Sequence, residues 1–435
     1  MGRRVTSFKL RLALVAAAAL TMRVAYLLAV GKDVTGIGDF YFYHWSANLI
    51  ADGRGYTDPF VLSFQDVALP TAEHPPLWSF LLAVVSILGG AGSPLGVTGP
   101  EGDFVAHRLA GCVVGAAVVV LIGLLGRRLG GERVGLVAAG IAAVYPVLIT
   151  ADASLMSETL YGFFVVWAVL LAYRLIDRPT AGRAAALGAV VGLAALTRGE
   201  GLLLLPLLAI PLAWRGGRTG RALRVGAACA GMLIVIAPWT IRNFSAVDGF
   251  VPVSTNDGGV IGGANCKRTY HGNDLGYWRS DCLPREDRAI AKAEYARQGR
   301  ERGIEYAGEH AGRLLTVVVP VRLLRTWDLW QTERQSTLVE GRDPETWRAG
   351  VIVYFALLPL AAVGLFSLRR RGEPIWPLVS LLVLVTVSSV GGFGNPRFRH
   401  AAEIALVIGG AAGLLYAYQR VREIARIPAV REALE

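Results

Sequence analysis

Long apolar runs separated by short basic segments dominate the pattern of hydrophobic and polar positions along the chain. Ten of these runs approach the roughly 20 residues that an α-helix needs to cross a bilayer. They lie at residues 10–30, 105–127, 133–150, 157–176, 183–198, 200–214, 221–241, 349–368, 374–391 and 400–418. The pattern predicts an all-α, polytopic membrane protein with about ten transmembrane helices.

Arginine residues cluster in the segments between these runs and predict the orientation of the chain. The clusters are Arg127, Arg128 and Arg133; Arg174, Arg178 and Arg183; Arg215, Arg218, Arg221 and Arg224; Arg369, Arg370 and Arg371; and Arg420, Arg422 and Arg426. The positive-inside rule places all of them in the cytoplasm, together with both chain ends. The net charge of +11 is therefore explained by topology in a cytoplasmic (inner) membrane, and no nucleic-acid partner is expected.

This topology divides the chain into three regions. Residues 1–241 form a transmembrane module with a first outer loop at 31–104, residues 242–348 form a larger extracytoplasmic region, and residues 349–435 hold the last spans and a basic tail. The shorter apolar runs 76–90 and 313–325 would each invert the charge pattern if they crossed the membrane singly. We expect outer juxtamembrane helices there, and a hairpin with a neighbouring run is the alternative.

Acidic residues at the outer ends of the predicted spans are the first candidates for chemistry, because ionisable groups at a membrane face are costly unless they are paired or functional. Asp39 follows a glycine and could simply cap a helix. Glu158 would lie in a first helical turn, where the helix dipole favours an acid. The functional alternative for Asp39 is a carboxylate that accepts a proton from a hydroxyl group.

Aromatic residues crowd around Asp39, in the segment GDFYFYHWSANLIADGRGY that starts at Gly38. They could form an interfacial belt. Alternatively, rings such as those of Tyr43 and Trp45 could stack on a sugar or pack on a lipid chain. Glu73 and His74 precede two prolines, a pattern that indicates at least a helix start.

The segment between Cys266 and Cys282 is expected to lie outside the cytoplasm, where disulfides persist. We therefore expect these two cysteines to form a disulfide bond. A zinc site that includes His271 is the alternative, although it has few other ligands. The rings of Tyr277 and Trp278 could form an acceptor-binding lid or the packed core of the loop.

Six short motifs occur in a fixed order along the chain. They are GDFYFY at 38–43, PTAEHPPLW at 70–78, MSETLYGF at 156–163, ALTRGEGLLLLP at 195–206, PWTIRNF at 238–244 and NPRFRH at 395–400. Their order and spacing resemble the GT-C superfamily, over about residues 20–405. Within it, the chain looks like bacterial family-39/83-type transferases, which are related to protein O-mannosyltransferases and the lipid A aminoarabinose transferase.

The resemblance implies an enzyme that takes a sugar from a polyprenyl-phosphate carrier and transfers it outside the cytoplasmic membrane. Asp39 matches the catalytic aspartate of the first loop, and Glu158 matches a second outer acid that is an aspartate in some branches. The residues expected beside the donor's lipid phosphate are Glu73, His74, Arg198, Arg397 and Arg399. Arg198 could instead only pair with Glu200.

The chemistry of such a donor agrees with these residues. A polyprenyl phosphate is a good leaving group, so the reaction needs a base for the acceptor hydroxyl and cations for the phosphate, for which arginine is suited. In-line attack would invert the anomeric carbon. The expected partners are the carrier-linked sugar, membrane lipid and a glycan, lipid or protein acceptor. No cofactor is expected, and a divalent metal is left open. The alternatives are a transporter or lipid-carrier flippase, and a catalytically silent relative.

Overall fold

The computed structural model describes residues 2–34, 38–89, 103–215, 220–284 and 292–425. These residues are arranged mainly as helices, and their one β interaction is an isolated bridge between Thr57 and Pro70. The helices of the first half are α1 (Gly2–Ala29), α2 (Asp39–Ala51), α3 (Pro59–Gln65), α4 (Leu77–Gly89), α5 (Asp103–Val144), α6 (Pro146–Ala153), α7 (Glu158–Asp177), α8 (Ala181–Ala195), α9 (Ile210–Trp214) and α10 (Arg221–Ala246). The remaining helices are α11 (Asn256–Ala264), α12 (Lys267–Tyr270), α13 (Lys292–Glu309), α14 (Ala311–Arg313), α15 (Val319–Thr326), α16 (Thr332–Ser336), α17 (Pro344–Arg370), α18 (Trp376–Gly391) and α19 (His400–Ile424).

Every apolar run that predicted a span lies mostly in helix, so the predicted all-α membrane fold is confirmed. Among the described residues, six helical segments are long and apolar enough to cross a membrane, and four shorter apolar helices accompany them. Two predicted spans belong to the single long helix α5, which bends sharply at Gly131, where φ is 80°. A side chain rarely adopts this backbone conformation, and glycine does so without steric cost.

Small residues bring the membrane-type helices close together. Helix α17 packs on α19, and a Cβ atom added at Gly364 would collide with the backbone of Gly409. Such contacts are typical of membrane helices, whose association depends on close packing because lipid tails are as apolar as the helices. The NPRFRH motif lies directly before α19, mostly in a 3-10 turn at Pro396–Arg399.

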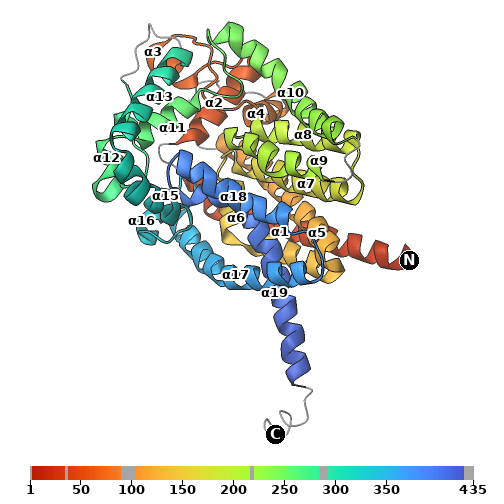
Figure 1. Ribbon diagram of the computed structural model, residues 1–435. Helices are drawn as coiled ribbons and strands as arrows, with labels where there is room; N and C mark the ends of the chain where they lie inside the picture. The colour runs from red at the N-terminus through yellow and green to blue at the C-terminus, as the bar shows by residue number, and fades with distance from the viewer. Residues whose placement is uncertain (1, 35–37, 90–102, 216–219, 285–291, 426–435) are drawn as a thin grey trace.

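The two short apolar runs form helices that pack beside the outer segments rather than apart from them. Run 76–90 forms α4, which packs on α2 and α5, and run 313–325 forms α14, a π-helical turn and α15, which packs on α18. In Figure 1, α3, α11, α12 and α13 gather at the upper left, while the N- and C-terminal ends leave at the right and at the bottom.

Helices α11 to α16 occupy much of the region that was predicted to be a large polar loop. Cys266 and Cys282 form the expected disulfide bond across a sequence separation of 16 residues. Parts of the predicted loops 31–104 and 242–348, and the basic tail after residue 425, lie outside the described residues.

Candidate functional site

Arg397 lies at the centre of a cluster of carboxylates from three separate segments. Its guanidinium forms ion pairs with Asp39 at 3.1 Å and Glu158 at 3.3 Å, and a third with Glu340. The side chain is 8% exposed, whereas those of Asp39 and Glu340 are each 33% exposed. The two more exposed carboxylates therefore face accessible space, and Arg397 links them to the buried Glu158.

Arg198 is a second arginine that contacts Glu158. It forms ion pairs with Glu158 at 3.0 Å and with Glu200 at 2.5 Å. Arg198 thus pairs with Glu200, one of the two alternatives that the sequence left open, and it also contacts the cluster. The ring of Phe398 lies under both guanidinium groups, 5.6 Å from that of Arg198 and 5.4 Å from that of Arg397.

Asp39 is the first residue of α2 and does not cap it. Gly38 is the N-cap residue, and no side chain caps this helix end. The Asp39 carboxylate instead turns toward Arg397 and toward His74, whose Nε2 lies 3.8 Å away. Burial favours the neutral acid, but His74 and Arg397 outweigh it and hold the pKa of Asp39 below its ordinary value. The carboxylate is therefore ionised at neutral pH.

Helix α2 is held by the aromatic residues that the sequence placed around Asp39. Phe42 and Tyr43 are buried and pack against the His74 ring at centroid distances of 4.5 and 5.2 Å. The Tyr43 hydroxyl donates a hydrogen bond to Ser157, the residue before Glu158, over 3.1 Å. These rings are core residues, not an exposed interfacial belt, and they couple α2 to α7.

The turn that carries Glu158 has an unusual backbone. Leu155 has a φ of 63°, a left-handed conformation that is rare for a bulky residue, and its carbonyl accepts a 3.0 Å hydrogen bond from the Trp78 indole. Such strain persists where surrounding contacts enforce it, often at functional sites. Trp78 follows the two prolines after His74, so one short segment supports both Asp39 and Glu158.

A cavity of about 730 Å³ opens beside the cluster. Its walls include Phe40 of α2, Tyr277 and the segment from Thr337 to Pro344, and Glu340 lies on them. Burial raises the pKa of Glu340 above its ordinary value, and Asp39 adds to this effect while Arg397 opposes it. The site therefore presents two carboxylates of unequal acidity, and Asp39 is the stronger acid.

Several predicted site residues lie elsewhere. Arg399 is fully buried and pairs with Glu403 at 2.5 Å and Asp328 at 3.2 Å, on a separate network from that of Arg397. Trp45 is buried between the rings of Tyr41 and Phe60.

Trp278 and Glu73, two further predicted site residues, form hydrogen bonds outside the Arg397 cluster. The Trp278 indole donates to the carbonyl of Gly259 at 2.8 Å, which makes Trp278 part of the packed core of the outer region. Glu73 is partly buried next to His74, and its backbone N–H donates to Thr71. Of the two predicted lid rings, only Tyr277 lines the cavity.

Glu340 and Arg342 are the residues that sequence reasoning missed. They lie just before α17, in the segment EGRDP, where Asp343 caps the helix and Pro344 occupies its first turn. A charged stretch directly before a predicted span was the available signal, because Glu158 occupies the same kind of position. The ranges used for the outer region instead assigned these residues to a loop.

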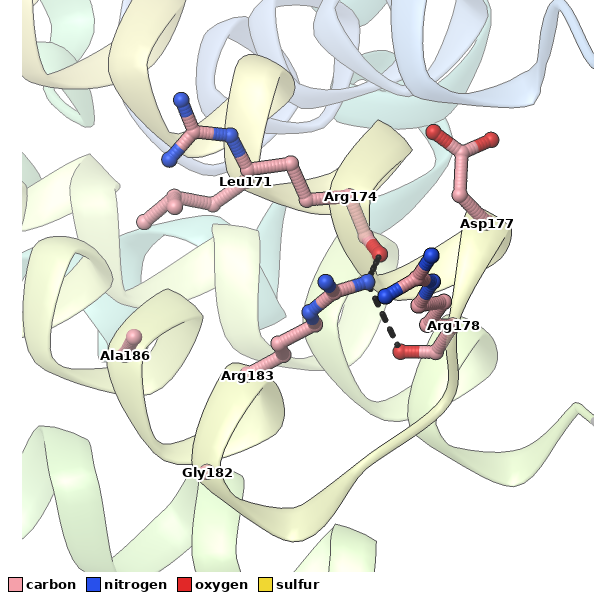
Figure 2. A pocket seen from close by; sticks show the side chains of 7 residues that line it. All are labelled: Leu171, Arg174, Asp177, Arg178, Gly182, Arg183 and Ala186. Carbon is pink, nitrogen blue, oxygen red and sulfur yellow. Dashed lines mark hydrogen bonds between the residues drawn. The ribbon is translucent and has the colours of Figure 1, made fainter.

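A second, basic groove of about 610 Å³ lies at the other end of α7. Figure 2 shows Arg183 directing its guanidinium to the carbonyl oxygens of Arg174 and Arg178, over 2.6 and 3.3 Å. Helix α7 has 20 residues, so the groove and Glu158 are separated by about 30 Å, close to the thickness of a bilayer. The basic cluster at residues 174–183 and the acidic site thus lie at opposite ends of α7.

Comparisons with known proteins agree with this architecture. The family model for dolichyl-phosphate-mannose-protein mannosyltransferase matches residues 73–241. No curated protein sequence matches the chain. Among solved structures, the archaeal oligosaccharyltransferase AglB from Archaeoglobus fulgidus, in complex with an inhibitory peptide and a dolichol-phosphate, superposes with a TM-score of 0.59 at 17% identity. The match covers 99% of this chain and 52% of that one, so the present chain spans about half the length of AglB.

Two further structures are similar at comparable identity. The A. fulgidus oligosaccharyltransferase in complex with Zn and sulfate matches at 15% identity with a TM-score of 0.57, covering 97% of this chain and 51% of that one. ArnT from Cupriavidus metallidurans, bound to undecaprenyl phosphate, matches at 17% identity with a TM-score of 0.44, covering 95% and 80%. The chain is thus a polytopic membrane protein with the GT-C fold. Within this class, residues 73–241 carry the sequence pattern of the dolichyl-phosphate-mannose-protein mannosyltransferase family.

Proposed function

We propose that this protein is an integral-membrane glycosyltransferase that moves a monosaccharide from a polyprenyl-phosphate carrier to an acceptor on the extracytoplasmic side. The observation that carries the proposal is the position of Asp39, an ionised and partly exposed carboxylate held by Arg397 beside a cavity. The family match over residues 73–241 supports sugar transfer, and the dolichol-phosphate in the AglB structure supports a lipid-phosphate carrier.

In the proposed reaction, Asp39 accepts the proton of an acceptor hydroxyl while the acceptor oxygen attacks the anomeric carbon of the sugar. The bond between that carbon and the carrier phosphate breaks, and the electron pair leaves with the phosphate. Attack from the side opposite the phosphate inverts the anomeric carbon. The lowered pKa of Asp39 keeps it ready to accept a proton at neutral pH.

The other residues of the cluster are proposed to position these reactants. Glu158 holds Arg198 and Arg397 in place from the protein interior, and His74 lies near the carboxylate oxygen of Asp39 that Arg397 does not contact. We assign the sugar donor and the acceptor to the cavity beside this cluster, whose walls include Tyr277.

The position of the cluster favours an enzyme over a transporter. Transporters bind their substrates near the bilayer midplane, at broken helices. Here the ionisable residues lie at the beginnings of α2, α7 and α19, which places them at helix ends. A flippase would need no carboxylate beside the reacting sugar, so the test of Asp39 separates the two functions.

The first experiment compares the native protein with Asp39→Asn in membranes that are supplied with radiolabelled polyprenyl-phosphate sugars. Asparagine keeps the shape of the side chain but is a poor base, so we expect transfer to fall by about 100-fold or more. Matched expression and an unchanged thermal unfolding midpoint control for folding. Undiminished transfer by Asp39→Asn would refute its role as the base, and absence of transfer by the native protein with every donor would favour the transporter function.

A further inference from the structure

Arg342 is a buried arginine that forms no ion pair among the described residues. It is 5% exposed and lines the cavity beside Glu340. Its guanidinium lies 5.0 Å from the centre of the Trp347 ring, which covers one face of the group. The Nε atom is buried without a hydrogen bond, and within the described part of the chain no ion pair or side-chain hydrogen bond reaches Arg342. A cation buried in this way is costly, which makes a ligand the natural partner.

The neighbouring arginines differ in this respect. Arg198 is neutralised by two carboxylates, Arg397 by three, and Arg399 by two others. An anion that approached any of these three would have to compete with carboxylates already in place. Unlike these three arginines, Arg342 can bind an anion without first losing an ion pair.

The acids on the cavity wall do not supply the missing charge. Glu340 pairs with Arg397, and the Asp343 carboxylate accepts hydrogen bonds from the backbone N–H and hydroxyl of Thr346, each over 2.7 Å. Asp33 is exposed at the end of the segment that follows α1. Burial lowers the pKa of Arg342 to about 10, despite the opposing effect of Glu158, so the side chain is still charged at neutral pH and gains from a bound anion.

We propose that Arg342 binds the phosphate group of the polyprenyl carrier, with the cavity between Phe40, Tyr277 and Glu340 as the space that the headgroup enters. This inference rests on the proposed function, and it assigns to Arg342 the phosphate that the late arginine motif was expected to bind. Arg397 then serves to orient Asp39 and Glu340. The planar guanidinium of Arg342 offers paired N–H donors that match two phosphate oxygens.

The test measures thermal unfolding of the purified full-length protein in detergent with four probes at equal concentration: farnesyl phosphate, farnesol, phosphatidylglycerol and inorganic phosphate. We expect farnesyl phosphate to raise the unfolding midpoint of the native protein more than farnesol does. Arg342→Gln should weaken the apparent affinity for farnesyl phosphate by about 10- to 100-fold, the loss expected for a charge-assisted contact. Arg348→Gln removes an exposed arginine six residues further along and should leave the affinity unchanged.

The protein without ligand provides a second readout. If Arg342 were a structural residue, Arg342→Gln would lower the unfolding midpoint; loss of an uncompensated buried charge should instead leave the midpoint unchanged or raise it. Equal binding by Arg342→Gln and native protein would overturn the inference while leaving the proposed function intact. Absence of any effect of farnesyl phosphate on the native protein would count against the proposed function itself. Stabilisation by phosphatidylglycerol to the same extent, dependent on Arg342, would assign the site to bulk lipid headgroups instead of the carrier.

Discussion

At the residue scale, one arginine contacts two carboxylates of unequal acidity. Arg397 contacts both Asp39 and Glu340, yet the pKa of Asp39 lies below its ordinary value and that of Glu340 above it. Asp39 also has His74 close to it, whereas Glu340 lies nearer the cavity wall. The Asp39 carboxylate therefore ionises at a lower pH than the Glu340 carboxylate.

Replacement of Arg397 by lysine tests this arrangement. Lysine keeps the charge but is a single point donor, so it cannot hold three carboxylates at once. The pKa of Asp39 should rise, and because the active form needs the ionised carboxylate, transfer should be lost at a higher pH than in the native enzyme. We expect the acidic limb of kcat/KM to move up by about one pH unit. Arg420→Lys, at an exposed ion pair near the end of α19, is the control and should not move it.

At the element scale, the site depends on how closely helices approach one another. Helix α19 follows directly after the short turn that carries Arg397, and α19 is fixed by its glycine-mediated contact with α17. Asp39 and Glu158 likewise lie at the first residues of α2 and α7. Each charged residue is therefore placed by the packing of the helix that it begins, so a shift of a helix becomes a shift in the site.

Gly364→Ala tests this dependence. The added methyl group would collide with the backbone of Gly409 and force α17 and α19 apart. Overpacking of this kind costs about 1–3 kcal/mol, so the unfolding midpoint should fall and transfer activity should fall with it. Gly140→Ala in α5 is the matched control, because a Cβ atom there meets nothing within 4 Å. Similar unfolding midpoints for the two variants would show that the α17–α19 contact tolerates separation.

At the scale of the whole molecule, the basic groove and the acidic cluster lie at opposite ends of a membrane-type helix. The arginine groove at the end of α7 and the acidic cluster at its beginning are separated by the length of that helix. The disulfide bond lies within residues 242–348, the region that the sequence predicts to be extracytoplasmic, where thiols oxidise. These features predict that the site faces away from the cytoplasm.

Cysteine labelling in intact cells checks this orientation. In a background with Cys112→Ala and Cys229→Ala, the free thiols are removed while the disulfide remains. A membrane-impermeant maleimide should label Glu301→Cys in α13 without permeabilisation, and Glu423→Cys near the end of α19 only afterwards, because we predict that the first faces outside and the second the cytoplasm. Labelling in the reverse order would invert the topology and place the site in the cytoplasm.

The sequence by itself determined the membrane helices, the disulfide pair and the segments that carry Asp39, His74, Glu158 and Arg198. These follow from local signals, since hydrophobic length and basic clusters do not depend on how helices pack. Only the tertiary structure separated Arg397 from Arg399, because two arginines one residue apart point to different networks. It also brought Glu340 and Arg342 to the site. Whether a buried charge is paired depends on side chains from distant segments, which no local pattern encodes.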